Sequence, residues 1–455
     1  MFCIFIKMKI VIVCNFPSAL NGNEISGRFL YLGEMLRERG HQVEMIVSDF
    51  NHALKSHRAE GNINHQAFQT KITVLHEPGY PNNVSIKRLW SHYQWGRNVG
   101  RYLKSIEKPD VIYCALPSLT AGVRAAKYCQ KHGVRFVIDV QDIWPEAFEM
   151  AIRNKLLQKI FLPIRWYVNR AYRAADTVVA VSETYAARAL SVNKKTDKGV
   201  IAFLGKDMRL FDEFKQSGKV YHAAVSPSAV CPSCVPSVAS EQSSSATSSG
   251  TADGGSGTAD GGLGTAAVAE PVEAPVKIAY VGSLGYSYDL PGAIRAIDIC
   301  QRMDNMPHLQ FVVMGQGPLQ KKFEDYAREL GVDCVFTGYM PFCDLVATMC
   351  SCDIVVNPIL ESAPQSITNK VGDYALSGLP VVNSQLNPEY RQLVDDYHCG
   401  INCKVADAED MARALATLIK DPALRKEMGA NARKLGEEKF DRRTAYQKIV
   451  KMLES

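Results

Sequence analysis

Two stretches of this sequence share one pattern, in which short apolar runs alternate with longer amphipathic segments. From Met8 to about Phe214, runs such as KIVIVCNF, QVEMIVSDF and DVIYCALP are separated by segments of helix length. Buried runs of four to eight residues between helical segments are typical of βα units, which build parallel sheets. Gly40 and Gly133 stand where helices are expected to end before the next strand. The pattern predicts a doubly wound α/β domain.

The same alternation returns at Val276, with KIAYVGSLG, LQFVVMGQG and IVVNPIL as the apolar runs. Between the two stretches the heptapeptide SGTADGG occurs twice, at 249–255 and 256–262, in a Ser/Gly-rich tract with too little apolar surface to offset ordering entropy. The sequence therefore predicts an N-terminal domain, a disordered insertion, a second α/β domain, and a C-terminal helix that packs back on the first domain. The boundaries are 1–214, 215–275, 276–435 and 436–455.

The overall composition indicates a globular protein and excludes some classes of partner. Hydrophobic residues make up 47% and charged residues 22%, and the net charge of +5 is spread along the chain. A nucleic-acid binder would gather its basic residues into arms or stripes, so we expect no nucleic acid. The 13 cysteines show no repeated spacing, which favours reduced thiols in the cytoplasm and no metal site. The sequence contains no run of about 20 uncharged apolar residues, so we expect no membrane span.

Glycines follow the first strand of the first domain. Gly22, Asn23 and Gly27 lie between that strand and the next helix. Backbone N–H groups at such a helix start bind anions, so these residues are candidates for a phosphate-binding loop in the first domain. An ordinary βα turn is the alternative, because glycine is common in such turns.

The second domain also carries glycines directly after its strands. Gly282 and Ser283 follow KIAYV, and the run Gly315-Gln316-Gly317 follows LQFVVM. The second run is like the opening of a dinucleotide fingerprint, but Gln320 stands where the third glycine is required. The spacing therefore does not indicate a nicotinamide cofactor.

Residues 366–384, SITNKVGDYALSGLPVVNS, are the most specific part of the chain. They predict a helix that begins near Thr368 or Asn369 and ends before the strand LPVVN. Lys370 and Asp373 share one face of its first turn. A cation at a helix N-terminus is suited to a diphosphate, and a carboxylate one turn deeper to ribose hydroxyls. The alternative is a solvated intrahelical ion pair, worth about 0.2 to 0.5 kcal/mol.

This stretch resembles the donor-site motif of family-4 glycosyltransferases, and within them the branch that makes bacterial O-antigen and capsule polysaccharide. The likeness covers nearly the whole chain outside the insertion. It includes GHQV, DVQDIWPEAF and ADTVVAVSE before the gap, and YVGSLG, VVMGQGP, VFTGYMP and CDIVVNP after it. The resemblance implies the GT-B fold, in which two Rossmann-like domains face each other.

The resemblance also implies a reaction: retaining transfer of a sugar from a nucleotide diphosphate donor, most simply a UDP-sugar, to a saccharide or polyprenyl-linked acceptor, with no metal cofactor. Lys370 would then be the main diphosphate ligand and Asp373 the ribose ligand. Gln365 replaces the acid expected near the sugar, so backbone amides of the loop would take over that role. The residues expected at the donor are Gly282, Ser283, Gly315, Gln316, Gly317, Gly338, Tyr339, Ser366, Ile367, Thr368, Asn369 and Asp373.

Two further segments have a functional and a structural interpretation. Asp142, in VQDIWPE, would orient the acceptor hydroxyl by resemblance, or would cap a helix that begins near Trp144. Residues 152–173 combine many Lys and Arg with aromatic and aliphatic residues and have no acid, which is typical of peripheral binding to an anionic membrane surface. The alternative is a helix pair broken at Pro163, with its apolar face in the domain core.

Three other functions remain open at this stage. A non-hydrolysing UDP-sugar epimerase has the same two-domain architecture and would turn over the donor without an acceptor. A catalytically weak, transferase-like binding subunit would hold a partner enzyme. A dehydrogenase would give a nicotinamide signal on binding.

Overall fold

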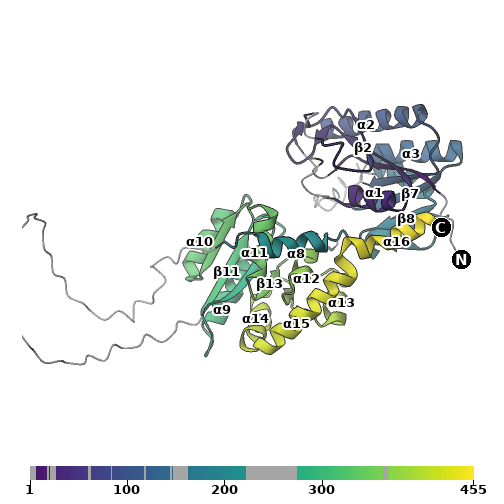
Figure 1. The fold of residues 1–455 in the computed structure, drawn as a ribbon. Coiled ribbons are helices and arrows are strands. Elements are labelled where there is room, and N and C mark those ends of the chain that lie inside the picture. Colours follow the sequence, from purple (N-terminus) through teal and green to yellow (C-terminus); the bar gives the residue numbers. More distant parts are fainter. Residues whose placement is uncertain are drawn as a thin grey trace, which may run out of the picture.

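The structure, a computed structural model, describes residues 7–17, 20, 27–59, 63–82, 85–116, 119–143, 146, 162–221, 274–361 and 367–455. Within these ranges the chain forms two lobes, each built on a parallel sheet with helices on both faces (Figure 1). The predicted fold class is confirmed. Most of the predicted insertion, residues 222–273, lies outside the described residues.

The N-terminal lobe has a sheet with the strand order β5-β2-β1-β6-β7-β8-β9, in which all neighbouring strands are parallel. Its strands are β1 (Lys9–Cys14), β2 (Gln42–Ser48), β5 (Lys71–Leu75), β6 (Val111–Leu116), β7 (Arg135–Val140), β8 (Thr177–Ala180) and β9 (Gly199–Ile201). The central strands are buried on both faces, which explains their continuous apolar runs. A short hairpin of β3 (Phe50–Asn51) and β4 (Ser56–His57) follows β2.

Helices cover both faces of this sheet. The helices are α1 (Arg28–Glu38), α2 (Ile86–Ser105), α3 (Leu119–His132), α6 (Leu162–Ala174) and α7 (Glu183–Leu190). One face packs against α2, α3, α6 and α7, and the other against α1 and the C-terminal helix. Gly40 and Gly133 adopt positive φ angles of 87° and 63° just after α1 and α3, so both predicted helix ends are confirmed.

The C-terminal lobe has a parallel sheet with the strand order β12-β11-β10-β13-β14-β15. Its strands are β10 (Val276–Val281), β11 (Leu309–Met314), β12 (Cys334–Gly338), β13 (Ile354–Asn357), β14 (Val381–Asn383) and β15 (Gly400–Asn402). Its helices are α9 (Leu290–Gln301), α10 (Gln320–Leu330), α11 (Phe342–Cys350), α12 (Lys370–Ser377), α13 (Pro388–Tyr397), α14 (Ala408–Lys420) and α15 (Pro422–Leu435), which a π-helix, η5 (Gly436–Phe440), extends. Helices α9, α10 and α14 cover one face, and α11, α12, α13 and α15 cover the other.

The two lobes exchange one helix each. Helix α8 (Met208–Ser217) extends into the first residues of the predicted insertion, 215–275, and its Phe211 is buried in the core of the C-terminal lobe. Helix α16 (Arg442–Glu454) leaves that lobe and packs on the N-terminal sheet beside α1 (Figure 1). The N-terminal lobe therefore ends near residue 207 rather than 214, because the apolar face of α8 is complementary to the other core.

The chain crosses between the lobes twice, and the two crossings are hydrogen-bonded to each other. The Lys206 N–H donates to the Phe440 carbonyl at 2.7 Å, and the Arg442 N–H donates to the Lys206 carbonyl at 2.9 Å. The ring of Phe203 stacks on Phe440 with centroids 5.1 Å apart. These contacts form a short double connection that sets how the sheets face each other.

Docking of α16 makes a testable contribution to stability. Ile449 is fully buried in the N-terminal core, so Ile449→Ala should lower the free energy of unfolding by about 2 to 5 kcal/mol through the lost transfer energy and the cavity left behind. Chemical denaturation measures this change. The control Lys448→Ala, at an exposed position of the same helix, should stay within about 0.5 kcal/mol of wild type. Equal effects would show that α16 is not docked.

Candidate functional site

The strand order locates the expected ligand region of each lobe. It reverses between β1 and β6 in the first sheet and between β10 and β13 in the second. In doubly wound sheets, ligands bind outside the carboxyl ends of the strands at such switch points. The chain that leaves β1 leads into α1, and the chain that leaves β13 leads into α12. The beginnings of these two helices are therefore the parts of the two lobes to examine.

A cavity of about 220 Å³ lies between the lobes and is lined by both. Gly27 and Arg28 contribute from the start of α1, Lys206 from the first crossing, and Asn369 from the residue before α12. Arg442, at the start of α16, completes the lining. Three of these five residues are cationic, so the cavity is suited to an anion.

The N-terminus of α1 opens towards this cavity. Gly27 precedes the helix with φ 89°, a left-handed conformation that favours glycine, and no described side chain caps the helix. Free N–H groups and the helix dipole attract negative charge at such an end. The predicted phosphate loop thus reaches the cavity through Gly27, whereas Gly22 and Asn23 lie outside the described residues.

Arg28 was missed by the sequence analysis, although it lies deep in the cavity wall. Its side chain is only 3% exposed. Nε is 2.6 Å from Asp139 Oδ2, and Nη1 donates to the Ala202 carbonyl at 2.7 Å. The Tyr113 hydroxyl donates to the same Asp139 oxygen. The remaining nitrogen, Nη2, is buried without a partner among the described residues, which leaves a donor available to a ligand.

Asp373 has a partner that the sequence did not predict. Its Oδ2 accepts from the Lys206 Nζ at 2.8 Å, across the junction between the lobes. Burial raises the pKa of the Asp373 carboxyl, and the Lys206 ammonium opposes this shift. The alternative interpretation, a solvated ion pair between Asp373 and Lys370, is wrong. Both side chains are buried, and the Lys370 ammonium makes no hydrogen bond to any described residue.

Lys370 opens α12 as predicted, but its side chain does not line the cavity. Nζ lies 4.5 Å from the ring centroid of Tyr280 and 4.1 Å from that of Tyr288, and it is buried without a hydrogen-bond partner among the described residues. Burial lowers the pKa of Lys370 well below its usual range. A buried ammonium without a hydrogen-bond partner among the described residues is costly, and an anionic ligand beside it would offset that cost.

The glycines at the ends of β10 and β11 pack against each other. The Gly282 N–H donates to the Met314 carbonyl at 3.0 Å, and the Gly315 N–H donates to the Gly338 carbonyl at 3.1 Å. A Cβ at Gly315 would lie 1.9 Å from the Gly282 carbonyl oxygen, and one at Gly317 would lie 2.4 Å from that of Leu284. These glycines are required for the close approach of two loops.

The other donor-side residues take different positions. The Ser283 carbonyl accepts from the Tyr280 hydroxyl, and the Gln316 carbonyl accepts from the Leu284 N–H. Tyr339 is 78% exposed. A direct role of any of these residues, or of Gly338, in holding the donor stays a prediction.

The loop before α12 is described only in part. Ser366 lies outside the described residues, together with Gln365. Ile367 is buried in the core of the C-terminal lobe. The Thr368 hydroxyl is buried without a partner among the described residues, and Asn369 lines the cavity. Asn369 is thus the residue of this predicted set that the structure places at the cavity.

Asp142 lies beside the cavity rather than in its lining, which the neighbouring Gln141 reaches. The carboxylate accepts from the Ile143 N–H at 2.9 Å. Burial lowers the pKa of Arg88, and Asp142 is among the groups that oppose this shift. Residues 144–145, where the predicted helix would begin, lie outside the described residues, so both interpretations of Asp142 stay predictions.

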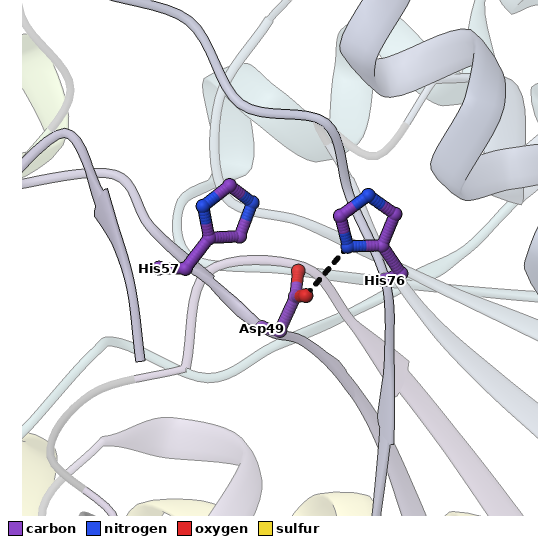
Figure 2. A group of neighbouring side chains, drawn as sticks. All are labelled: Asp49, His57 and His76. Carbon is purple, nitrogen blue, oxygen red and sulfur yellow. Dashed lines mark hydrogen bonds and ion pairs between the residues drawn. The ribbon is translucent and has the colours of Figure 1, made fainter. Parts of the chain in front are cut away.

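One group of described side chains has the composition of a metal site. Possible ligand atoms of Asp49, His57 and His76 all lie within 4.8 Å of one another (Figure 2). His76 Nδ1 is 2.7 Å from Asp49 Oδ2, and His57 Nε2 is 2.8 Å from the Glu77 carbonyl oxygen. Both imidazoles therefore already bond to protein oxygens. The expectation that no metal cofactor is used stays a prediction.

The basic segment 152–173 is described from residue 162 onwards, where it forms α6. Val168 and Tyr172 of this helix are buried in the N-terminal core, as the structural interpretation expects. Trp166 is 59% exposed and lies under Arg170. Within the described residues, no helix is long and apolar enough to cross a membrane. Membrane attachment through this segment stays a prediction.

Comparison with known proteins supports the interpretation of both lobes. Residues 267–435 match the family model "Glycosyl transferases group 1", and residues 28–198 match "Glycosyltransferase Family 4". Both lobes are glycosyltransferase family domains. They are arranged in the GT-B fold. The predicted restriction to an O-antigen or capsule branch goes beyond these matches.

Individual relatives agree with this assignment. A glycogen synthase of Mycobacterium tuberculosis is 26% identical over 180 residues, which are 39% of this chain and 42% of the length of that enzyme. HepE from Anabaena, solved with UDP, has a TM-score of 0.61 and 16% identity, with 98% of this chain and 99% of that chain covered. Sucrose-phosphate synthase from Thermosynechococcus elongatus has a TM-score of 0.62 and 13% identity, with 98% of this chain and 98% of that chain covered. At these identities the solved structures support the fold alone.

The buried contact between Arg28 and Asp139 stabilises the N-terminal lobe as well as positioning Arg28 at the cavity. Asp139→Ala would leave the buried Arg28 guanidinium without its carboxylate, so the free energy of unfolding should fall by about 3 to 5 kcal/mol. Denaturant titration measures the loss. Glu107→Ala, which removes the exposed partner of Lys9 at 3.1 Å, is the matched control and should cost less than about 1 kcal/mol. A comparable loss in both variants would contradict the central role of the buried pair.

Proposed function

We propose that this protein is a retaining glycosyltransferase that moves a hexose or N-acetylhexosamine from a UDP-sugar to a saccharide or polyprenyl-linked acceptor. The process would be cell-surface polysaccharide biosynthesis of the capsule or O-antigen type, in the cytoplasm at the inner face of the membrane. The observation that carries the proposal is the cationic cavity between the lobes. The likeness to HepE, whose structures contain UDP and UDP-glucose, supports this type of donor.

The chemical requirement is stabilisation of the leaving group. A departing nucleoside diphosphate gains negative charge, and preorganised donors that meet this charge lower the barrier. Three groups surround the same space: the N-terminus of α1, which no described side chain caps, the Arg28 Nη2, which has no described partner, and the ammonium of Lys206. In this proposal they hold the diphosphate from the side of the N-terminal lobe.

The donor would also change two contacts of the C-terminal lobe. The Lys370 ammonium, which now lies on the rings of Tyr280 and Tyr288, would turn towards the phosphates through its flexible side chain. Lys206 would exchange its bond with Asp373 for one with a phosphate oxygen. Asp373 would then accept a ribose hydroxyl, as the sequence predicted. The proposal therefore includes a rearrangement of cations when the donor binds.

The acceptor would approach from the N-terminal lobe. Gln141 lines the cavity, and Asp142 follows it with Arg88 nearby. In this proposal Asp142 orients the acceptor hydroxyl. The proposal invokes no metal cofactor. A peripheral attachment to an anionic membrane, expected from residues 152–173, belongs to it as well.

Lys370→Ala separates this function from a structural role. The ammonium has no described hydrogen-bond partner, so its removal should leave the melting temperature unchanged or raised, since an unpaired buried charge costs stability. Turnover, measured as UDP release from a panel of UDP-sugars with a saccharide acceptor, should fall by at least about a hundredfold. Lys322→Ala, at an exposed position of α10, should retain full activity.

Two results would contradict the assignment. Wild-type turnover in Lys370→Ala would remove this residue from the reaction. Equal conversion of the UDP-sugar with and without acceptor would favour an epimerase, because an epimerase needs no acceptor.

A further inference from the structure

A second cavity, of about 340 Å³, lies between α2 and α3, outside the inter-lobe site. No acidic residue is among the described residues that line it. Six of its lining residues are cationic: Arg97, Arg101, Lys104, Arg124, Lys127 and Lys131. We call this surface the basic groove.

Two glycines of α2 allow this helix and α3 to pack closely along the groove. A Cβ at Gly96 would lie 2.6 Å from the side chain of Thr120, and one at Gly100 would lie 3.4 Å from that of Arg124. Because these positions carry no side chain, α2 and α3 pack tightly. The basic residues recur at intervals of three and four on each helix, which places them on one face. The two basic faces meet along the groove.

Within the described parts of the chain, no carboxylate neutralises the charges of the groove. None of the six side chains forms an ion pair with a described carboxylate. The Nε of Arg124 is also buried without a hydrogen-bond partner among the described residues. Like charges gathered in one groove repel each other, so an external anion would be bound there favourably.

Exposed aromatic side chains lie next to basic residues on α2 and on α6, the helix that packs on α3. Trp90, on α2, is 55% exposed and stacks on Tyr93, whose ring also lies under Arg97. On α6, Trp166 is exposed under Arg170. Trp and Tyr beside Lys and Arg are typical of surfaces that lie at a membrane interface, where the rings enter the headgroup layer.

We propose that the basic groove, together with Trp90, Tyr93 and Trp166, binds the headgroups of an anionic phospholipid membrane. Helices α2 and α3 lie side by side on the part of the N-terminal lobe that faces away from the C-terminal lobe (Figure 1). A membrane bound there leaves the inter-lobe cavity accessible. This inference deepens the proposed function, on which it rests, because it adds the basic groove to the membrane contact expected from residues 152–173 and brings the enzyme to a lipid-linked acceptor.

The test is flotation of the full-length protein with vesicles of phosphatidylglycerol and phosphatidylcholine, and with vesicles of phosphatidylcholine alone. Wild type should bind only the anionic vesicles, and less at high salt because salt screens the attraction. The triple variant Arg101→Glu, Lys127→Glu, Lys131→Glu should bind the anionic vesicles at least about tenfold more weakly, since each basic residue near such a surface contributes several-fold.

The matched control reverses three exposed lysines elsewhere, Lys194→Glu, Lys322→Glu and Lys426→Glu, and so changes the net charge equally. It should keep its affinity within about threefold. A further variant, Trp90→Ala with Trp166→Ala, should weaken vesicle binding without any change of charge. Melting temperatures confirm that each variant is folded.

Several outcomes would overturn the inference. Equal losses in the groove variant and the control would show a nonspecific charge effect. Binding of wild type to heparin or single-stranded RNA but not to anionic vesicles would make the partner a soluble polyanion. Vesicle binding that depends on the groove in a protein that binds no UDP would refute the proposed function and leave the membrane surface in place, so the two failures are distinguishable.

Discussion

The pairing of the two chain crossings at Lys206 is the contact on which the geometry between the lobes depends. The backbone of Lys206 bonds to Phe440 and Arg442 on the returning chain, and its ammonium bonds to Asp373 of the C-terminal lobe. One residue thus joins the first crossing, the second crossing and α12. Helix α8 follows the N-terminal lobe in sequence but packs on the C-terminal lobe, and α16 follows the C-terminal lobe but packs on the N-terminal lobe. The crossings therefore cannot separate without exposing apolar surface. This double connection holds the two walls of the cavity, one from each lobe, at their distance from each other.

The buried charges of the site differ in how well they are satisfied. Arg28 is held by Asp139 and by a backbone carbonyl, so most of its desolvation cost is offset within the lobe. The ammonium of Lys370 has two tyrosine rings and no described hydrogen-bond partner. A fold selected only for stability would have an apolar residue there. The proposed diphosphate supplies the missing counter-charge, which explains why a lysine at the start of α12 is compatible with a folded lobe.

The sequence was sufficient for the fold because strand and helix periodicities are local. It predicted the two parallel sheets, the helix ends at Gly40 and Gly133, and a helix that begins near Thr368 or Asn369, where α12 has Asn369 as its N-cap. It did not predict that Asp373 pairs with Lys206, since this contact joins residues far apart in the chain, nor that Arg28 would enter the cavity. The helical pattern around Phe211 did not indicate whether α8 would pack in the core of the N-terminal or of the C-terminal lobe. Glycines such as Gly315 allow two loops to pack closely, and their contact with the donor stays a prediction, because close approach to a ligand and close approach to another loop require the same residue type.

The most direct test of the account is the proton balance of UDP binding, measured by titration calorimetry at pH 8 and at a series of higher pH values, each in two buffers of different ionisation enthalpy. The phosphates of UDP are already deprotonated at this pH, since their second pKa is about 6. Burial lowers the pKa of Lys370 in the free protein, and a diphosphate beside it would raise that pKa. The account predicts proton uptake on binding at pH values between the lowered and the raised pKa, an affinity that weakens as the pH rises across this window, and loss of the uptake in Lys370→Met. Binding of UDP with no proton uptake, or with the same uptake in the variant, would contradict it.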